Sequence, residues 1–385
     1  MRVLYVIDSL AGGGAERSLA ALAPHYPARG LELEVAYLRP VDGLQPEFER
    51  TGVRLFDLSG PRGRLGWVDR CARLVRSVRP DLIHTTLFEA DLAGRAAGAI
   101  TRVPVVSSLV NVTYTDAQLD DPNLRPWKIR GARFLDAVSA RRVVRFHAIT
   151  VHVADEMSRR LRLDRSRVDV VPRGRDPEQL GRRTEGRRSK ARSSLGVEPG
   201  TPVVLAAARQ EYQKGLDVLL EAFERVVRGE PRARLLVAGR EGNQTRELEE
   251  IVARLRLDGS VTFLGVRSDV EDLMCAADLF VMPSRWEGLG SVLIEAMGLE
   301  VPVVASDLGP VREVVGEDGA ARLVPVEDRA AMAKAIVDAL ADPGGSAVMA
   351  RRAYDRFVER FTIDRVADGM ERFYRRALNR EEVAA

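Results

Sequence analysis

The sequence contains little cysteine and no long apolar run. Cys71 and Cys275 are its only cysteines among 385 residues, which is too few for a disulfide framework or a cysteine-based zinc site. No run of roughly eighteen apolar residues is present, so no transmembrane helix is predicted. The first apolar run, residues 3–7, ends at Asp8 and has the length of a strand, not of a signal peptide. We expect a cytoplasmic protein that at most touches the inner face of a membrane.

An excess of charge of either sign is also absent. The formal net charge is +3, although 30% of the residues are charged. Nucleic-acid binding is therefore not expected, because it needs a strongly basic surface. Lysine supplies only four of the 59 basic residues, and arginine supplies the others. A lysine in this chain is consequently more informative than an arginine.

Apolar runs of strand length alternate with helical patterns along the chain. The predicted strands are residues 3–7, 33–37, 82–84, 103–107 and 148–151, followed by 203–207, 234–238, 261–264, 279–282 and 301–305. This alternation is typical of parallel α/β sheets covered by helices on both faces. A polar, arginine-rich stretch at 184–194 interrupts it, and we interpret this stretch as a linker between two domains. A final amphipathic helix is predicted at 364–376.

A glycine-rich turn follows the first predicted strand. Gly12, Gly13 and Gly14 precede a helical pattern, and a glycine turn at a helix N-terminus lets backbone N–H groups approach an anion. A nicotinamide site is not expected, because its third glycine is replaced by Arg17 and no acid ends the second strand. A plain tight turn is the alternative, but three consecutive glycines are more than a turn requires.

Two further stretches follow strands of the second half. Arg209 and Lys214 could bind a diphosphate from two sides, one with a fork of donors and the other with a compact charge. A solvated loop is the alternative, and the scarcity of lysine argues against it. The loop at Val266 could offer backbone groups to a nucleobase or could be a simple connector.

The most informative stretch is 283–306, where two carboxylates flank a glycine turn. Ser291 is expected to cap a helix that runs through Glu295, so that the N–H groups near Gly290 face a phosphate. Glu287, before the turn, could then bind a sugar, and Glu295, about two helical turns further on than Glu287, a ribose. Two exposed glutamates without a ligand are the alternative.

The residues of this stretch, P-S-x-x-E-G-x-G-x-x-x-x-E-A-M-x-x-x-x-P-V-V-A-S, resemble the pattern of the retaining glycosyltransferases of family 4. The glycine turn, the Arg209–Lys214 pair and the Phe263-Leu264-Gly265 run agree with this resemblance, which extends from Arg2 to about Tyr374. The family has the GT-B fold, in which two facing Rossmann-like α/β domains enclose a cleft. The resemblance implies an acceptor-binding domain at 1–172, a nucleotide-sugar-binding domain at 173–363 and a helical segment at 364–385 that packs back on the first domain.

The resemblance also implies an activity, namely transfer of a hexose-type sugar from a nucleoside diphosphate sugar, with uridine preferred, to a hydroxyl acceptor with retention of configuration. The implied catalytic residues are Glu287, Arg209 and Lys214, and the implied donor-binding residues are Gly13, Gly14, Gly239, Val266, Gly290, Ser291, Val292 and Glu295. No cofactor or metal is expected, since the chain lacks a D-x-D pair. Two alternatives stay open: an epimerase or hydrolase of nucleotide sugars, and a non-catalytic nucleotide-sugar-binding subunit.

The acceptor side departs from the family pattern. Many members carry a histidine where this chain has Val110 and Asn111, and asparagine can hold a hydroxyl but cannot act as a base. His84 is a second acceptor-side candidate, with a buried structural histidine as the alternative. The sequence leaves open whether the acceptor is a lipid-linked glycan, a cyclitol or another natural product, and it assigns no oligomeric state. The basic, partly apolar segment 125–145 could rest on anionic lipid or be a solvated face.

Overall fold

The computed structural model describes residues 1–379 except 42, 62 and 116–124. The chain divides into two compact units: unit 1 comprises Met1–Asp176 with Thr362–Ala385, and unit 2 comprises Pro177–Phe361. Residues 380–385 of the predicted segment 364–385 lie outside the described residues. Within the described part of the chain, no helix is both long and apolar enough to cross a membrane.

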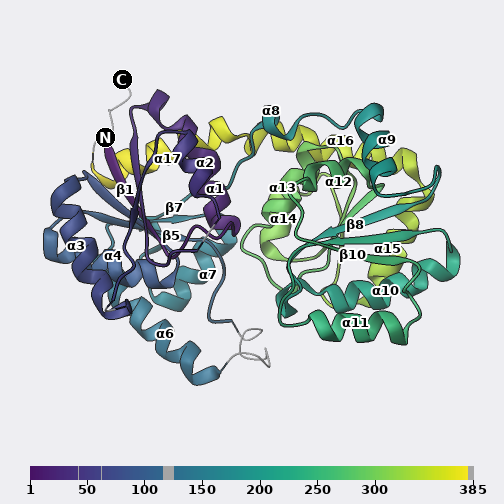
Figure 1. The fold of residues 1–385 in the computed structure, drawn as a ribbon, viewed down its shortest axis with the longest axis horizontal. Coiled ribbons are helices and arrows are strands. Elements are labelled where there is room, and N and C mark those ends of the chain that lie inside the picture. The colour runs from purple at the N-terminus through teal and green to yellow at the C-terminus, as the bar shows by residue number, and fades with distance from the viewer. Residues whose placement is uncertain (42, 62, 116–124, 380–385) are drawn as a thin grey trace. The chain divides into compact units, whose positions relative to one another are not determined.

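Unit 1 is built on a seven-stranded parallel sheet of order β3-β2-β1-β4-β5-β6-β7 (Figure 1). Its strands are β1 (Arg2–Ile7), β2 (Glu32–Tyr37), β3 (Arg54–Asp57), β4 (Leu82–Thr86), β5 (Val105–Leu109), β6 (Arg145–Ala148) and β7 (Val168–Val170). Its helices are α1 (Gly14–Leu22), α2 (Gln45–Arg50), α3 (Trp67–Val78), α4 (Phe88–Thr101), α6 (Pro126–Ser139), α7 (Val151–Leu161) and α17 (Ile363–Ala377). Short 3₁₀ turns are η1 (Ala23–His25), η2 (Pro27–Arg29), η3 (Gly63–Gly66), η4 (Ala140–Arg142) and η5 (Arg165–Arg167).

Both faces of the unit 1 sheet are covered, as the continuous apolar strands predict. Along β1, Val3 and Ile7 point to a core shared with α1 and α17. Leu4 and Val6 point to the opposite core, shared with α3 and α4. The last helix of the chain therefore completes one face of unit 1.

Unit 2 contains a six-stranded parallel sheet of order β10-β9-β8-β11-β12-β13 (Figure 1). Its strands are β8 (Val203–Ala207), β9 (Arg234–Ala238), β10 (Val261–Gly265), β11 (Leu279–Met282), β12 (Val303–Ser306) and β13 (Arg322–Val324). Its helices are α8 (Pro177–Leu180), α9 (Glu185–Ser194), α10 (Leu216–Gly229), α11 (Thr245–Arg254), α12 (Val270–Ala276), α13 (Ser291–Gly298), α14 (Gly309–Val315), α15 (Arg329–Ala341) and α16 (Pro343–Arg360), with a 3₁₀ turn η6 (Tyr212–Lys214). Helices α10, α11 and α15 pack one core against this sheet. The predicted α/β class with two Rossmann-like sheets is confirmed.

The predicted linker is wrong. Residues 185–194 form helix α9, whose N-cap Thr184 accepts a hydrogen bond from the backbone N–H of Arg187. Arg188 of this helix donates to the carbonyl of Ala277 (3.0 Å) and to the carboxylate of Asp278 (2.6 Å). The arginines that suggested a solvated linker therefore cap the end of helix α12, where unsatisfied carbonyls attract cations.

Candidate active site

In unit 2, two loops meet where the order of the strands reverses. Strand β8 pairs with β9 on one side and with β11 on the other, and open α/β sheets bind ligands at such a reversal, at the carboxyl ends of the strands. The loop after β8 carries Arg209 and Lys214, and the loop after β11 carries Glu287 and Gly290. Residues 73 to 81 positions apart along the chain are thus brought to one edge of the sheet.

Lys214 and Glu287 are in direct contact. The ammonium Nζ of Lys214 lies 2.5 Å from Oε1 of Glu287, and the same oxygen accepts a hydrogen bond of 2.8 Å from the hydroxyl of Ser284. Glu287 is only 9% exposed. Two donors therefore hold this buried carboxylate in one orientation, as a residue that orients a ligand requires.

Arg285 locks the two loops together. Its guanidinium binds Asp217 in a bidentate pair of 2.9 and 2.7 Å, binds Glu327 at 2.7 Å and lies 4.0 Å from the centre of the Tyr212 ring. Its backbone N–H donates to the carbonyl of Gln213 at 2.8 Å. Burial lowers the pKa of Arg285, but the hydrogen bonds to Asp217 and Glu327 outweigh this effect and raise the pKa above its ordinary value. The loops after β8 and β11, which carry the candidate catalytic residues, are therefore held in a fixed arrangement by Arg285.

The glycine turn leads into helix α13, but its cap differs from the prediction. Gly290, with φ of 79°, is the N-cap, and Ser291 is the first helical residue. A positive φ suits glycine because it has no Cβ. The predicted capping role of Ser291 is therefore wrong. The helix N-terminus still lies at Gly290, Ser291 and Val292, and Glu295 follows within the helix.

The remaining predicted donor residues surround these loops. Arg209 follows β8, and its side chain is 46% exposed, with Glu211 at 3.6 Å as an ion-pair partner. Gly239 follows β9 with φ of 152°, and a Cβ there would lie 1.9 Å from the carbonyl oxygen of Ala208. Only glycine allows this close approach of two backbone segments, so close packing alone explains why position 239 is a glycine. Val266 follows β10 and is 75% exposed.

In unit 1, the glycine turn precedes helix α1. Gly13 is the N-cap, without a side-chain capping bond. A Cβ added at Gly14 would lie 2.7 Å from Nη1 of Arg173. The guanidinium of Arg173 thus approaches the start of α1, a contact between residues distant in the sequence that no local motif predicts.

His84 lies inside unit 1, in a chain of hydrogen bonds. It is buried, with Nδ1 at 2.7 Å from the Tyr374 hydroxyl and Nε2 at 2.7 Å from the Ser108 hydroxyl. Ser108 also lies 2.8 Å from Nδ1 of His147, whose Nε2 contacts the Val171 carbonyl at 2.8 Å. Burial lowers the pKa of both histidines, that of His147 to about 4. Since Val171 offers only an acceptor, neutral His147 donates to it, Ser108 donates to His147, His84 donates to Ser108 and Tyr374 donates to His84. The geometry favours the structural alternative for His84.

Asn111 lies in a segment after β5 that is tied down by polar contacts. Its Oδ1 is buried and makes no hydrogen bond within the described residues. Three residues on, Tyr114 donates to Oδ2 of Asp136 at 2.9 Å, and its carbonyl accepts from Arg160 at 2.7 Å. Tyr114 has a φ of 63°, which is costly for an aromatic residue. These contacts hold the segment that presents Asn111.

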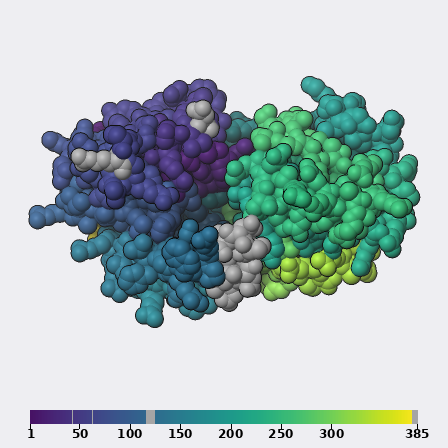
Figure 2. Space-filling view, turned by 60° about the horizontal axis from the view of Figure 1, so that its bottom comes forward, coloured from purple at the N-terminus to yellow at the C-terminus, as the bar shows by residue number. Residues whose placement is uncertain are grey.

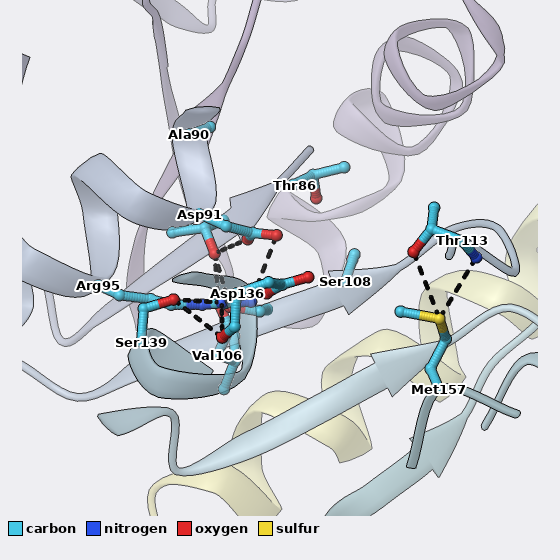
Figure 3. Close-up of polar contacts among 12 residues, drawn as sticks. Thr86, Ala90, Asp91, Arg95, Val106, Ser108, Thr113, Asp136, Ser139 and Met157 are labelled. Carbon is cyan, nitrogen blue, oxygen red and sulfur yellow. Dashed lines mark hydrogen bonds and ion pairs between the residues drawn. The ribbon is translucent and has the colours of Figure 1, made fainter. Parts of the chain in front are cut away.

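A buried ion-pair network anchors this segment to the helices (Figure 3). In the figure the side chains of Asp91, Asp136 and Ser139 gather around that of Arg95. Nη1 of Arg95 donates to Oδ1 of Asp136 (2.7 Å) and to Ser139 (2.9 Å), and Nη2 lies 3.3 Å from Asp91. Burial raises the pKa of Asp91 to about 7, against the opposing effect of Arg95.

Sequence reasoning missed a carboxylate at the reversal point of the unit 1 sheet. Asp8 directly follows β1, is buried and accepts a hydrogen bond of 2.7 Å from the N–H of Ala90. Burial raises the pKa of Asp8 to about 6, and the neighbouring Glu89 adds to the effect. The signal was present, since Asp8 ends the first apolar run. Among the described residues, no group of three or more His, Cys, Asp or Glu side chains is placed to hold a metal ion.

Comparisons with known proteins cover both units. Residues 187–356 match the family described as Glycosyl transferases group 1, and residues 12–179 match Glycosyltransferase Family 4. The chain is 30% identical over 400 residues to the 2-deoxystreptamine N-acetyl-D-glucosaminyltransferase of Streptomyces fradiae, covering 96% of this chain and 92% of that protein. It is 29% identical over 363 residues to a D-inositol 3-phosphate glycosyltransferase of Segniliparus rotundus, covering 91% of this chain and 77% of that protein.

A solved structure agrees with these sequence matches. The crystal structure of HepE from Anabaena in complex with UDP-glucose superimposes with a TM-score of 0.85 at 25% identity, covering 97% of this chain and 99% of that one. The predicted resemblance and the predicted GT-B architecture are confirmed.

Proposed function

The chain belongs to family 4 of the glycosyltransferases, and from this premise we propose that it moves a hexose-type sugar from a uridine diphosphate sugar to a hydroxyl group of a cyclitol, with retention of configuration. The two relatives named above act on 2-deoxystreptamine and on inositol 3-phosphate, which are both cyclitols. The solved relative binds UDP-glucose. A lipid-linked glycan is the second candidate acceptor.

The observation that carries this proposal is the contact between Lys214 and Glu287 beside the start of helix α13. A nucleoside diphosphate sugar presents a sugar, two phosphates and a ribose in a row. The N–H groups near Ser291 and the cations Arg209 and Lys214 suit the phosphates. Glu287 suits the sugar hydroxyls, and Glu295 suits the ribose, because carboxylates accept strong hydrogen bonds from hydroxyl groups.

The proposed reaction occurs on one face of the sugar. The bond between the anomeric carbon and the diphosphate oxygen breaks, the acceptor oxygen bonds to the same face of that carbon, and the acceptor proton passes to the departing phosphate. Arg209 and Lys214 offset the negative charge that gathers on the diphosphate. We propose that no metal is needed, since these two cations stabilise the leaving group. We also propose that unit 1 binds the acceptor, with Asn111 and Asp8 forming hydrogen bonds to its hydroxyl groups.

The test combines donor screening with product analysis. Thermal shift with uridine, guanosine and adenosine diphosphate glucose should single out the uridine compound, because ligand at a hundred times its Kd stabilises the folded state by about 2.7 kcal/mol. Incubation of that donor with 2-deoxystreptamine or inositol 3-phosphate should then release UDP and yield an α-linked product by NMR, with and without EDTA. Equally fast UDP release without acceptor would instead indicate a hydrolase. Conversion of the donor sugar without net UDP release would indicate an epimerase, and a β-linked product would contradict retention.

A further inference from the structure

Helix α6 buries one side and exposes apolar residues on the other. It packs against α4 and α7, and Asp136 on its inner side is buried. Its outer side carries Trp127 (66% exposed), Phe134 (68% exposed), Leu135 and Val138. A helix that is merely solvated would place polar residues there. Figure 2 shows α6, in blue-teal, as part of the outer surface of unit 1.

The outer side of α6 carries cations but no acid. The only acid of segment 125–145 is Asp136, which is turned inward to Arg95 and Tyr114. The exposed charges are therefore all positive: Arg125, Lys128, Arg130, Arg133, Arg141 and Arg142. In the structure, the acid of this segment thus lies on the inner side of α6 and the cations lie on its outer side, although they are neighbours in the sequence.

Most of these cations have no ion-pair partner in the part of the chain that the structure describes. Within the described residues, the side chains of Arg130, Arg141 and Arg142 form no hydrogen bond or ion pair, and Lys128 contacts only the Trp127 ring, at 5.6 Å from its centre. Many exposed arginines elsewhere are paired, as Arg73 is with Asp69 at 2.9 Å. Unpaired cations on one helix leave the surface with an unbalanced positive potential.

A groove of about 440 Å³ continues this surface toward the end of α7. Its lining combines Arg130, Arg141 and Arg162 with the apolar side chains of Phe134 and Leu163. The lining also includes one acid, Asp164, which accepts hydrogen bonds from Ser166. Such a combination fits a molecule with an anionic head and an apolar tail.

We propose that α6 and this groove form a docking surface for a membrane that contains anionic phospholipid. Lys and Arg interleaved with Trp, Phe and Leu on one helix suit the boundary between headgroups and acyl chains. A second copy of the chain fits poorly, because pairing α6 with itself would bring like charges together. Docking would hold the enzyme at a membrane surface whatever its donor and acceptor are, so this inference does not rest on the proposed activity.

The test is flotation of the full chain with vesicles, without donor or acceptor. With vesicles of phosphatidylcholine and phosphatidylglycerol at low salt, the protein should float, and it should be released at high salt. The double variant Lys128→Glu, Arg130→Glu should lower the partition coefficient at least about 30-fold, since each cation near an anionic surface contributes roughly a factor of five. The matched control Arg225→Glu, Arg256→Glu changes the net charge equally on unit 2, at exposed residues, and should float like the parent.

Apolar contacts are tested separately. Flotation should be weakened by the double variant Phe134→Ser, Leu135→Ser. It should not be weakened by the control double variant Val348→Ser, Val358→Ser, at exposed positions of α16. Equal binding to pure phosphatidylcholine vesicles, flotation that survives the Lys128→Glu, Arg130→Glu change, or no flotation at low salt would each overturn the proposal. A lipid-free dimer that the Phe134 variant converts to a monomer would show that a second copy covers this face instead.

Discussion

In unit 2 the polar residues at the carboxyl edge of the sheet belong to loops, whereas in unit 1 many belong to the strands themselves. Lys214 and Glu287 follow β8 and β11 and lie beside a helix start. His84 and His147 sit within β4 and β6, buried and bonded at both ring nitrogens. Loop residues can bind a ligand without disturbing the core, but strand residues cannot change without disturbing it. We therefore expect substitutions in unit 2 to impair catalysis and substitutions in the buried network of unit 1 to impair stability.

The largest effect is expected where the unit 1 network is broken. Arg95→Met leaves Asp91 and Asp136 buried without their shared cation, and removing one partner of a buried pair typically costs about 3–5 kcal/mol. Urea unfolding should show this loss. Hydrogen exchange should place it in peptides of unit 1, including the segment of Asn111.

A matched surface change separates burial from charge. Arg73→Met removes an exposed i,i+4 pair with Asp69, and such pairs contribute only about 0.3–0.5 kcal/mol. Equal losses for Arg73→Met and Arg95→Met would contradict the role given to burial in unit 1.

The next effect should fall mainly on turnover, with a smaller loss of stability than for Arg95→Met, because the side chain of Lys214 is 18% exposed and keeps some contact with water. Glu287→Gln keeps the shape of the side chain but removes the charge that faces Lys214 and that, in the proposed function, binds the sugar. We expect kcat to fall roughly 10²- to 10³-fold, as when one preorganised polar group of a site is removed. Donor Kd by calorimetry should change less than about tenfold. The control is Glu249→Gln on the exposed side of α11; an unchanged kcat for Glu287→Gln would remove this residue from the mechanism.

The same contrast explains what could be predicted from the sequence. Strands with continuous apolar runs, such as β8, β9 and β11, were predicted at their observed bounds, because burial on both faces requires such runs. The strands missed, β3, β7 and β13, are short and lie at sheet edges, where burial is partial. The predicted strand 148–151 was displaced, since β6 ends at Ala148 and α7 begins at Val151.

The site divides in the same way. The unit 2 candidates lie in short motifs that directly follow apolar runs, so their positions at strand ends could be predicted. That the loops after β8 and β11 meet follows from the strand order in the structure. Asp8 could have been identified from its place at the end of the first apolar run, but its burial and raised pKa depend on residues far away in the chain. The approach of Arg173 to Gly14 likewise depends on distant residues and has no local signal. Ser291 was mistaken for the N-cap, since a serine suits that position equally well and the backbone angle of Gly290 decides between them.

The hydrogen-bond chain of unit 1 should also make stability depend on pH. Burial lowers the pKa of His147 from 6.5 to about 4. Between pH 6.5 and pH 4, the unfolded chain therefore binds a proton at His147 that the folded chain does not bind. The free energy of unfolding must fall as the pH falls through this range. The loss should approach roughly 3 kcal/mol at pH 4. Asp8 and Asp91, whose pKa values are raised, act in the opposite sense over a similar range.

A variant of His147 separates the pH dependence caused by this histidine from that caused by the two carboxylates. His147→Gln can still donate to the Val171 carbonyl but cannot be protonated. The difference in unfolding free energy between parent and variant should shrink as the pH falls from 7 to 4.5, because only the parent loses this contribution. A difference that is constant across that range would mean that His147 is protonated in the folded protein and that the order of donors given above is wrong.

The smallest expected effect tests whether the scarcity of lysine in the chain indicates a specific role for Lys214. Lys214→Arg keeps the charge but replaces a compact ammonium by a planar fork. Lys214 ends the turn η6, and its ammonium lies 2.5 Å from the carboxylate of Glu287. A larger guanidinium there would displace this carboxylate. We expect kcat/KM to fall about tenfold, with unchanged unfolding free energy. Lys334→Arg, at an exposed pair with Asp338, should change neither quantity. If both variants behave like the parent, any cation suffices at position 214 and the contrast between the units rests on Glu287 alone.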